Sequence, residues 1–429
     1  MAHGEPHARN RVGRLLAALL LSALPAVASL ACTSGEEDGS KPDAQDAETA
    51  GGSAEQVSWE PSSPSVVTGP VTGGNGIQAP QPAVPVPEGW TTEEFFVGGN
   101  ATSFADGGGD GSEQPADGKW SAEPADEAEY LTRVIVHRPP AEDFSGTVLV
   151  EWLNVSAVEA SPDWAYLNEE VTREGHAYVQ VSAQEQGVMG GETILESDVD
   201  EEFAADVGAD ASTLPDGSGL VESDPERYGE LVHPGDEYAL DMFSQVGKAV
   251  TEDPALLGGL EADQVIGLGE SQSAFFLTTY ANAIQPMDAT YDGLLIHSRG
   301  GAAAPLQGLG EADADDESVV RSDPVLVRTD LDIPVLIFQA ETDMTLLGYA
   351  GARQDDTDLL RTWEVAGTAH ADAQLVRAIT GGPRDPAAGA LLGCDQPINT
   401  GPHAEVLSAA LNQLVDWVSG GEPPPQGPR

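Results

Sequence analysis

One stretch decides the fold of this chain, and it reads Gln264-Val265-Ile266-Gly267-Leu268-Gly269-Glu270-Ser271-Gln272-Ser273-Ala274-Phe275-Phe276. A short apolar run ends at Gly269 and Ser271, and a helix-like run over residues 272–284 follows at once. This order of strand, tight turn and helix, with a serine at the apex, is typical of a nucleophile elbow. The turn strains its central residue, so the flanking positions must be small, as Gly269 and Ser273 are. The alternative is a serine that merely caps a helix, and the residues downstream decide between the two.

The composition is strongly acidic. The 429 residues include 72 Asp and Glu against 18 Lys and Arg, which gives a formal net charge of −54, and 40% are hydrophobic, enough for a large core. Such a surface repels nucleic acid and anionic lipid headgroups, so we expect neither as a partner. Because like charges repel unless counterions screen them, we also expect a protein adapted to salt.

Residues 1–31 have the pattern of an export signal. Three arginines precede an apolar run over residues 15–24, which is too short for a good membrane span, and small residues follow. Cys32 comes next, where a bacterial lipoprotein carries its lipid, although Ser29 and Leu30 match a lipobox poorly. Secretion and a lipid anchor at Cys32 therefore both stay open. The only other cysteine, Cys394, offers no plausible disulfide partner for it.

The rest of the chain divides into a linker and one domain. Residues 32–87 are acidic and then rich in Pro and Gly, which predicts a disordered linker whose last part lies as an extended arm on the domain. Residues 88–425 carry the domain, and the acidic, Gly-rich residues 187–234 are a candidate lid.

Strands and helices alternate along this domain. We expect helices at residues 162–174, 237–250, 272–284 and 405–417. We expect the strands, besides the elbow strand, at residues 94–97, 130–137, 146–152, 177–182, 291–297, 334–338 and 361–365. Buried apolar strands that alternate with helices predict an α/β fold with a mostly parallel, doubly wound sheet.

Polar residues stand just past the ends of three core strands, in the order Ser271, Asp343 and His370. Chemistry in open α/β sheets gathers at these strand ends, and this order is that of the α/β-hydrolase fold. His370 would take the proton of Ser271 during attack, and Asp343 would orient the imidazole. The expected oxyanion donors are the backbone N–H of Gln272 and one at Asn154 or Val155.

Some of these assignments have rivals. Glu341 lies two residues before Asp343, and either acid could reach His370. The other histidines lie in the signal, in or beside strands, or in loops, where structural roles are common. Two roles are open for Arg299, just past a strand: to anchor a substrate carboxylate or simply to pair with a loop carboxylate. The acidic composition favours the second, structural role. No metal site is expected, because the acidic loop at residues 106–118 lacks the register of a calcium loop.

Longer strings in the chain resemble a bacterial α/β-hydrolase-domain family that is largely uncharacterised and often secreted. They are Val150-Glu151-Trp152-Leu153-Asn154-Val155, Val181-Ser182-Ala183-Gln184, Gly269-Glu270-Ser271-Gln272-Ser273, Tyr280-Ala281-Asn282-Ala283, Tyr291-Asp292-Gly293, His297-Ser298-Arg299-Gly300, Ala350-Gly351-Ala352-Arg353-Gln354-Asp355, Trp363-Glu364-Val365-Ala366-Gly367-Thr368-Ala369-His370, and Cys394 with Pro397 and Asn399. The resemblance implies the fold and implies Ser271 and His370 as catalytic residues. It leaves the choice between Glu341 and Asp343 open, and it supplies no substrate.

These observations predict an exported serine hydrolase that needs no metal or cofactor and acts on a small-molecule carboxylic ester through an acyl-enzyme. Amide or lactone hydrolysis on the same triad is the alternative within enzymes. A surface binding protein that kept the fold and lost the chemistry is the alternative from another class, and the complete set of serine, acid and histidine argues against it.

Overall fold

The structure is a computed structural model, and it describes residues 63–64, 66–81, 83–107, 114–156, 158–191, 218–308, 323–375 and 398–427. The predicted export signal, Cys32 and Cys394 lie outside these residues, as does the middle of the candidate lid. Among the described residues, no helix combines the length and the apolar character needed to cross a membrane.

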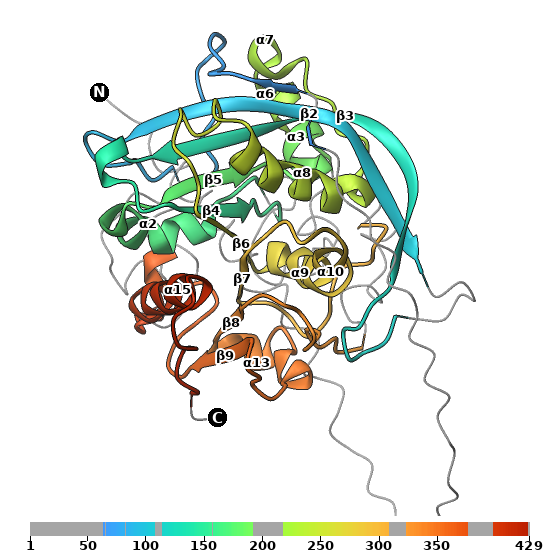
Figure 1. Ribbon diagram of the computed structural model, residues 1–429, viewed down its shortest axis with the longest axis vertical. Coiled ribbons are helices and arrows are strands. Elements are labelled where there is room, and N and C mark those ends of the chain that lie inside the picture. The colour runs from blue at the N-terminus through green and yellow to red at the C-terminus, as the bar shows by residue number, and fades with distance from the viewer. Residues whose placement is uncertain are drawn as a thin grey trace, which may run out of the picture.

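The described strands form a nine-stranded sheet in the order β1-β2-β3-β5-β4-β6-β7-β8-β9 (Figure 1). Their bounds are β1 Val66–Thr68, β2 Thr91–Asp106, β3 Ala122–Arg138, β4 Thr147–Trp152, β5 Ala177–Val181, β6 Gln264–Glu270, β7 Gly293–His297, β8 Val335–Ala340 and β9 Leu360–Val365. The six strands from β5 to β9 in this order pair in parallel, and β1, β2 and β3 add to them antiparallel. The prediction of a mostly parallel α/β sheet is confirmed.

Two layers of helices cover the sheet. On one face lie α2 (Pro162–Glu174) and α15 (His403–Val418), and on the other lie α8 (Ala239–Glu252) and α9 (Gln272–Thr279) (Figure 1). Side chains alternate between the two cores along each strand, so that Val148 packs toward α8 and α9 while Leu149 packs toward α2 and α15. Shorter helices follow at α3 Glu185–Met189, α6 Leu220–Ser223, α7 Pro225–Tyr228, α10 Gln285–Asp288 and α13 Glu341–Thr345.

The helix after the elbow differs from its predicted form. It was expected to run unbroken to residue 284, but α9 ends at Thr279, and a π-helical turn, Tyr280–Ile284, leads into α10. Pro286 has no N–H to donate to the carbonyl of Asn282, and Arg328 Nη1 donates to that oxygen instead, at 2.7 Å. A proline and an arginine from a distant loop together account for the change.

The predicted disordered linker does not extend to residue 87, because its last part lies on the domain as the expected extended arm. Val66–Thr68 already pair with β2, and Gln81 exchanges backbone hydrogen bonds with the loop before α2. Val84 packs into the core beneath α2 and accepts a hydrogen bond from the indole of Trp164 at 2.9 Å. Residues 66–87 therefore belong to the domain.

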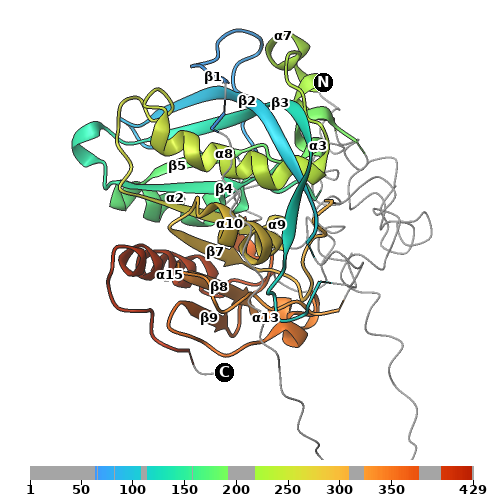
Figure 2. The same cartoon turned by 45° about the vertical axis from the view of Figure 1, so that its right-hand side comes forward.

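The first two core strands were predicted far too short. Residues 94–97 and 130–137 are parts of β2 and β3, which pair as a long curved ribbon (Figures 1 and 2). The acidic outer half of β3, residues 123–129, is mostly exposed and carries no apolar alternation, so hydropathy could not reveal it.

The described end of the candidate lid packs on this ribbon. Leu220, Tyr228 and Leu231 share a small core with Phe96 of β2, and Val232 pairs with Leu131 of β3. A lid function for residues 187–234 stays a prediction.

Candidate active site

Ser271 stands at the apex of a strained turn. Its backbone has φ 57° and ψ −116°, between the end of β6 at Glu270 and the start of α9 at Gln272. A residue other than glycine rarely adopts such a positive φ, because the backbone conformation costs about 1–3 kcal/mol. It persists only where the surrounding structure holds it. The N–H of Ser271 donates to the carbonyl of His297 at 3.0 Å, and a Cβ on Gly269 would lie only 3.1 Å from Ser273. The small flanking residues singled out in the sequence therefore sit where the turn leaves no room.

The structure brings Ser271, His370 and Asp343 into one line. His370 Nε2 lies 2.9 Å from Ser271 Oγ, and His370 Nδ1 lies 2.8 Å from Asp343 Oδ1. The other oxygen of Asp343 accepts the N–H of Ala340 at 2.7 Å. Burial favours the neutral acid, but His370 and hydrogen bonds from Ser298 and Ala340 outweigh it, so the pKa of Asp343 lies below its usual value. The acid beside His370 is thus held as a carboxylate.

Glu341 has a different position. Its carboxylate accepts the N–H of Gly367 at 2.6 Å and does not lie on His370. The next residue, Thr342, accepts the N–H of His370 at 2.8 Å through its hydroxyl. Of the two candidate acids, the structure places Asp343 on the imidazole, while Glu341 and Thr342 hold the loop that carries it.

The oxyanion donors can be narrowed from three to two. The N–H of Asn154 donates to the carbonyl of Ala160 at 2.9 Å, which contradicts its predicted role as a donor. The N–H of Val155 reaches the side-chain oxygen of Gln272 at 3.3 Å, and that oxygen would give way to a substrate. The N–H of Gln272, the first residue of α9, has no acceptor within the helix because helix N-termini leave such groups unpaired. Val155 and Gln272 remain the candidates.

Glu270 is a residue that the sequence reasoning did not single out. Its buried carboxylate lies 3.5 Å from His370 Nε2, on the side of the imidazole that faces Ser271. Burial raises the pKa of Glu270 to about 8, with Asp163 and Asp343 adding to the effect and His370 opposing it. Burial alone would lower the pKa of His370, but Glu270 and Asp343 outweigh it and raise that pKa to about 9. In the sequence, the only indication that Glu270 belongs to the site is its position directly before Ser271.

Comparison with known proteins supports the fold and gives the family. Residues 67–429 match the family model described as an alpha/beta hydrolase domain. The chain belongs to the alpha/beta hydrolase domain family. The resemblance drawn from the sequence is thereby confirmed, and the protein is a hydrolase of the α/β fold.

Several solved structures are similar at low identity. One comes from a study of two fungal esterases from Rhizomucor miehei, at 14% identity and TM-score 0.37 over 79% of this chain and 87% of that one. Esterase Est22 is similar at 13% identity and TM-score 0.39 over 78% and 82%. A putative dienelactone hydrolase from Klebsiella pneumoniae subsp. pneumoniae MGH 78578 is similar at 14% identity and TM-score 0.29 over 67% and 94%. No curated protein matches the chain.

Behind the triad, this α/β hydrolase carries a buried chain of hydrogen bonds. His297 Nδ1 lies 2.7 Å from Asp163 Oδ1, His297 Nε2 lies 2.7 Å from His403 Nε2, and His403 Nδ1 lies 3.0 Å from the carbonyl of Ala369. This series of hydrogen bonds ends at Ala369, one residue before His370. The ring of Tyr166 stacks on His403 with centroids 4.4 Å apart. The sequence offered only the interpretation of structural histidines, and the structure shows that these two support the His370 loop.

The last acceptor, the carbonyl of Ala369, decides which atom donates in each of these hydrogen bonds. A carbonyl only accepts, so His403 Nδ1 carries a proton, and its Nε2 must then accept from His297 Nε2. Burial lowers the pKa of both histidines to about 3, so neither is doubly protonated on its own account. His297 Nδ1 and Asp163 must therefore share one further proton, in agreement with the pKa of Asp163, which burial raises to about 8.

Arg299 is fully buried and cannot meet a substrate from this position. Its guanidinium donates to the carbonyls of Gly301, Ala302 and Val325, and it lies over the ring of Tyr349. The alternative that it anchors a substrate carboxylate is contradicted, and its role is structural, as the acidic composition favoured. It pairs with backbone carbonyls rather than with the loop carboxylate that was the structural alternative.

Among the described residues, no group of three or more His, Cys, Asp or Glu side chains is arranged to hold a metal ion. Ser271, His370 and Asp343 form a set of serine, base and acid, which can carry out acyl transfer.

We expect Glu270→Gln to move the acid limb of the pH–rate profile of this hydrolase toward lower pH. The limb reports the proton that His370 must lose before it can act as a base, and its pKa of about 9 depends on the Glu270 carboxylate. The measurement is kcat/KM for an activated ester from pH 5 to pH 10. The exposed Glu261→Gln is the control, and an unmoved limb in Glu270→Gln would contradict the assignment.

Asp163→Asn should flatten the dependence of stability on pH. Folded Asp163 keeps its proton up to about pH 8, whereas an unfolded aspartate loses it near pH 4, so this group makes the protein less stable as pH rises through that window. The asparagine amide can still donate to His297 but does not titrate. We expect the melting temperature to fall less between pH 5 and pH 8 than in the wild type. A fall equal to that of the wild type and of an exposed control, Asp332→Asn, would show that the shared proton is absent.

Proposed function

We propose that this α/β hydrolase is a serine hydrolase that cleaves carboxylic esters through an acyl-enzyme. The observation that carries the proposal is the unbroken line from Ser271 Oγ through His370 to Asp343, with the serine at a strained elbow. Strain of this kind is retained at functional sites and has no evident use in a serine that only caps a helix.

In the proposed reaction, Ser271 Oγ attacks the ester carbonyl while His370 Nε2 takes the hydroxyl proton. The N–H groups of Val155 and Gln272 stabilise the oxyanion after the Gln272 side chain gives way. When the tetrahedral intermediate collapses, the bond to the alcohol breaks and His370 returns the proton to the leaving oxygen. Water, deprotonated by His370, then attacks the acyl-enzyme and releases the acid and the free serine. Asp343 supports the imidazolium in both steps.

The electrostatics suit esters better than amides. The acids around His370 raise its pKa, which makes the imidazolium a weaker general acid, and an alkoxide can leave with less protonation than an amine. The same acids limit the neutral base near pH 7, so the rate should be highest in the alkaline range. Lactones fit the same chemistry, because ring opening also expels an alkoxide.

Labelling with a fluorophosphonate tests the nucleophile. We expect the wild type in molar salt to label fully, Ser271→Ala to lose labelling and Ser273→Ala to retain it. Ser273 is the matched control because it is a buried serine two residues away, on α9. Hydrolysis of p-nitrophenyl esters without hydrolysis of the corresponding anilides would support an esterase over an amidase. A folded wild type that does not label would contradict the proposal and favour the non-catalytic binding protein.

We also propose that the protein is exported, as residues 1–31 suggest, and that Cys32 decides whether it stays at the cell surface. Cell fractionation of a bacterial host that expresses the full chain tests both points. For a lipid anchor, we expect the wild type in the membrane fraction, released by detergent, and Cys32→Ser in the medium. Both forms in the medium would mean plain secretion, and both in the cytoplasm would contradict export.

A further inference from the structure

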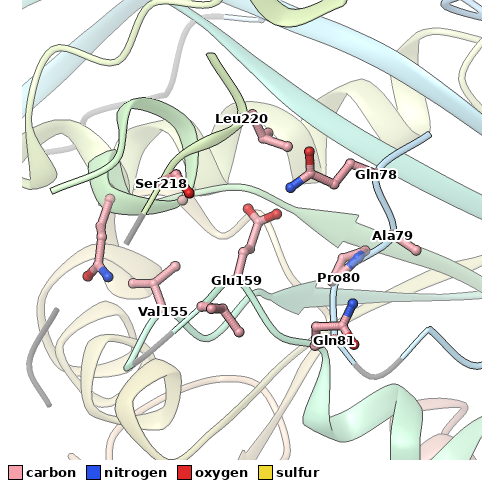
Figure 3. Close-up of a pocket in the computed structure, with 11 residues that line it drawn as sticks. Gln78, Ala79, Pro80, Gln81, Val155, Glu159, Ser218 and Leu220 are labelled. Carbon is pink, nitrogen blue, oxygen red and sulfur yellow. The ribbon is translucent and has the colours of Figure 1, made fainter. Parts of the chain in front are cut away.

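A cavity of about 260 Å³ lies beside the loop that carries Val155, and Ser271 and His370 do not line it. Four segments far apart in the sequence form its walls: the N-terminal arm, the β4–α2 loop, α3 and the start of α6. The lining residues that matter here are Gln78, Gln81, Val155, Glu159 and Leu220, which Figure 3 labels, and Gln186. The cavity is thus next to the proposed oxyanion site and separate from the triad.

Glu159 supplies this cavity with an unused acceptor. One of its oxygens forms an ion pair with the buried guanidinium of Arg133, while Oε1 has no hydrogen-bond partner among the described residues. The side chain is only 10% exposed, and its carboxylate points toward the space between Gln78 and Ser218 (Figure 3). A buried acceptor without a partner costs about 1–3 kcal/mol. Because Oε1 itself is buried, a ligand that donates to it must first turn the carboxylate further into the cavity, and the new hydrogen bond would then recover this cost.

The walls define the chemistry of that ligand. Because Arg133 offsets the charge of Glu159, the site suits a neutral donor better than a cation. The side-chain amides of Gln78, Gln81 and Gln186 can donate and accept, and a hydroxyl group does both. Between the amides lie apolar surfaces from Val155, Val158, Pro80 and Leu220, which suit a short carbon skeleton. Ligand pockets commonly combine apolar walls with a few polar groups in this way.

Val155 connects this cavity to the chemistry. Its side chain lines the cavity, and its backbone N–H reaches the side chain of Gln272, next to the serine. A substrate whose carbonyl oxygen takes the place of the Gln272 oxygen would therefore contact the residue whose side chain lines the cavity.

We propose that the cavity is a substrate subsite for a hydroxylated aliphatic group attached close to the ester carbonyl. The proposal rests on the proposed ester hydrolysis and adds the substrate class to it. The hydroxyl can belong to the alcohol part or to the acyl part of the ester, and the experiment separates these two sources.

Gly187 offers a way to close the subsite without touching the triad. A Cβ at this position would lie 2.8 Å from Glu159 Oε1 and 3.2 Å from Val155 Cγ1, so Gly187→Ala places a methyl group against the acceptor. Gly187 lies within α3, where alanine is the better helix former, so we expect no loss of folding. The control is Gly427→Ala, whose Cβ would have no neighbour nearer than 3.9 Å. Gln186→Leu removes one amide and serves as the second variant.

The assay compares kcat/KM within two pairs of esters. The alcohol arm compares 2,3-dihydroxypropyl acetate with propyl acetate, and the acyl arm compares ethyl 3-hydroxybutanoate with ethyl butanoate. We expect the wild type to prefer the hydroxylated member of one pair by about tenfold, the value of roughly one hydrogen bond. Gly187→Ala and Gln186→Leu should lose that preference through a raised KM for the hydroxylated ester. Retained fluorophosphonate labelling checks that the oxyanion donor Val155, against which the new methyl group of Gly187→Ala lies, has kept its place.

Other outcomes overturn the proposal in different ways. Equal rates on both members of both pairs, by an enzyme that labels and turns over, would overturn the subsite alone. A preference that survives in Gly187→Ala would place the hydroxyl elsewhere. A stronger preference for acetylcholine than for either hydroxylated ester would replace the neutral ligand by a cation. Hydrolysis of none of these esters and no labelling would overturn the proposed function with it.

Discussion

The backbone conformation at Ser271 is the constraint on which the rest of the site depends. A positive φ at a serine is unfavourable, and here the surroundings leave the chain no other path. β6 is paired on both sides, its end is held through the carbonyl of His297, and Ser273 packs against Gly269 too closely for a side chain there. Because the strand and α9 are both fixed by the core, the strain is confined to the one residue whose hydroxyl must project from the sheet. Packing of the sheet and of α9 thus fixes the position of the proposed nucleophile, Ser271.

Around this residue the protein buries acids and balances them with protons more than with cations. Glu151, Asp163, Glu270 and Asp343 are buried, and burial raises the pKa of the first three. Asp343 is the exception, with a pKa below its usual value, and it is the acid that lies on His370 Nδ1. A stable anion therefore stands where acyl transfer requires one. The chain has only 18 lysines and arginines, so few cations are available to neutralise buried carboxylates. Keeping a proton neutralises such a group without the free-energy penalty of burying a second charge.

The sequence predicts those elements whose structure is determined by a single local pattern of residues. The elbow, the apolar core strands and the bounds of α2 follow from periodicity, small residues and caps, and the structure bears them out. The outer half of β3 was missed because it is held by pairing with β2 rather than by burial. The arm was expected to lie on the domain, but its strand β1 was missed because its few apolar residues lie in Pro-rich sequence. The role of Asn154, the partners of Arg299 and the presence of Glu270 at the site depend on residues that are distant in the chain, so neighbouring residues could not reveal them.

The order of the strands also bears on how the site comes into being. β4 and β6 lie side by side at the centre of the sheet, yet Thr147 and Gln264, which face each other there, are 117 residues apart. Closing a loop of that length costs entropy before any contact repays it, and sheets built from such distant pairs fold slowly. Val155 and Ser271 lie on these two strands' loops, so they meet only after the central pair has formed. A partly folded chain can therefore hold secondary structure and a local β8–β9 pair while it lacks any hydrolytic site, and activity becomes a late marker of complete folding.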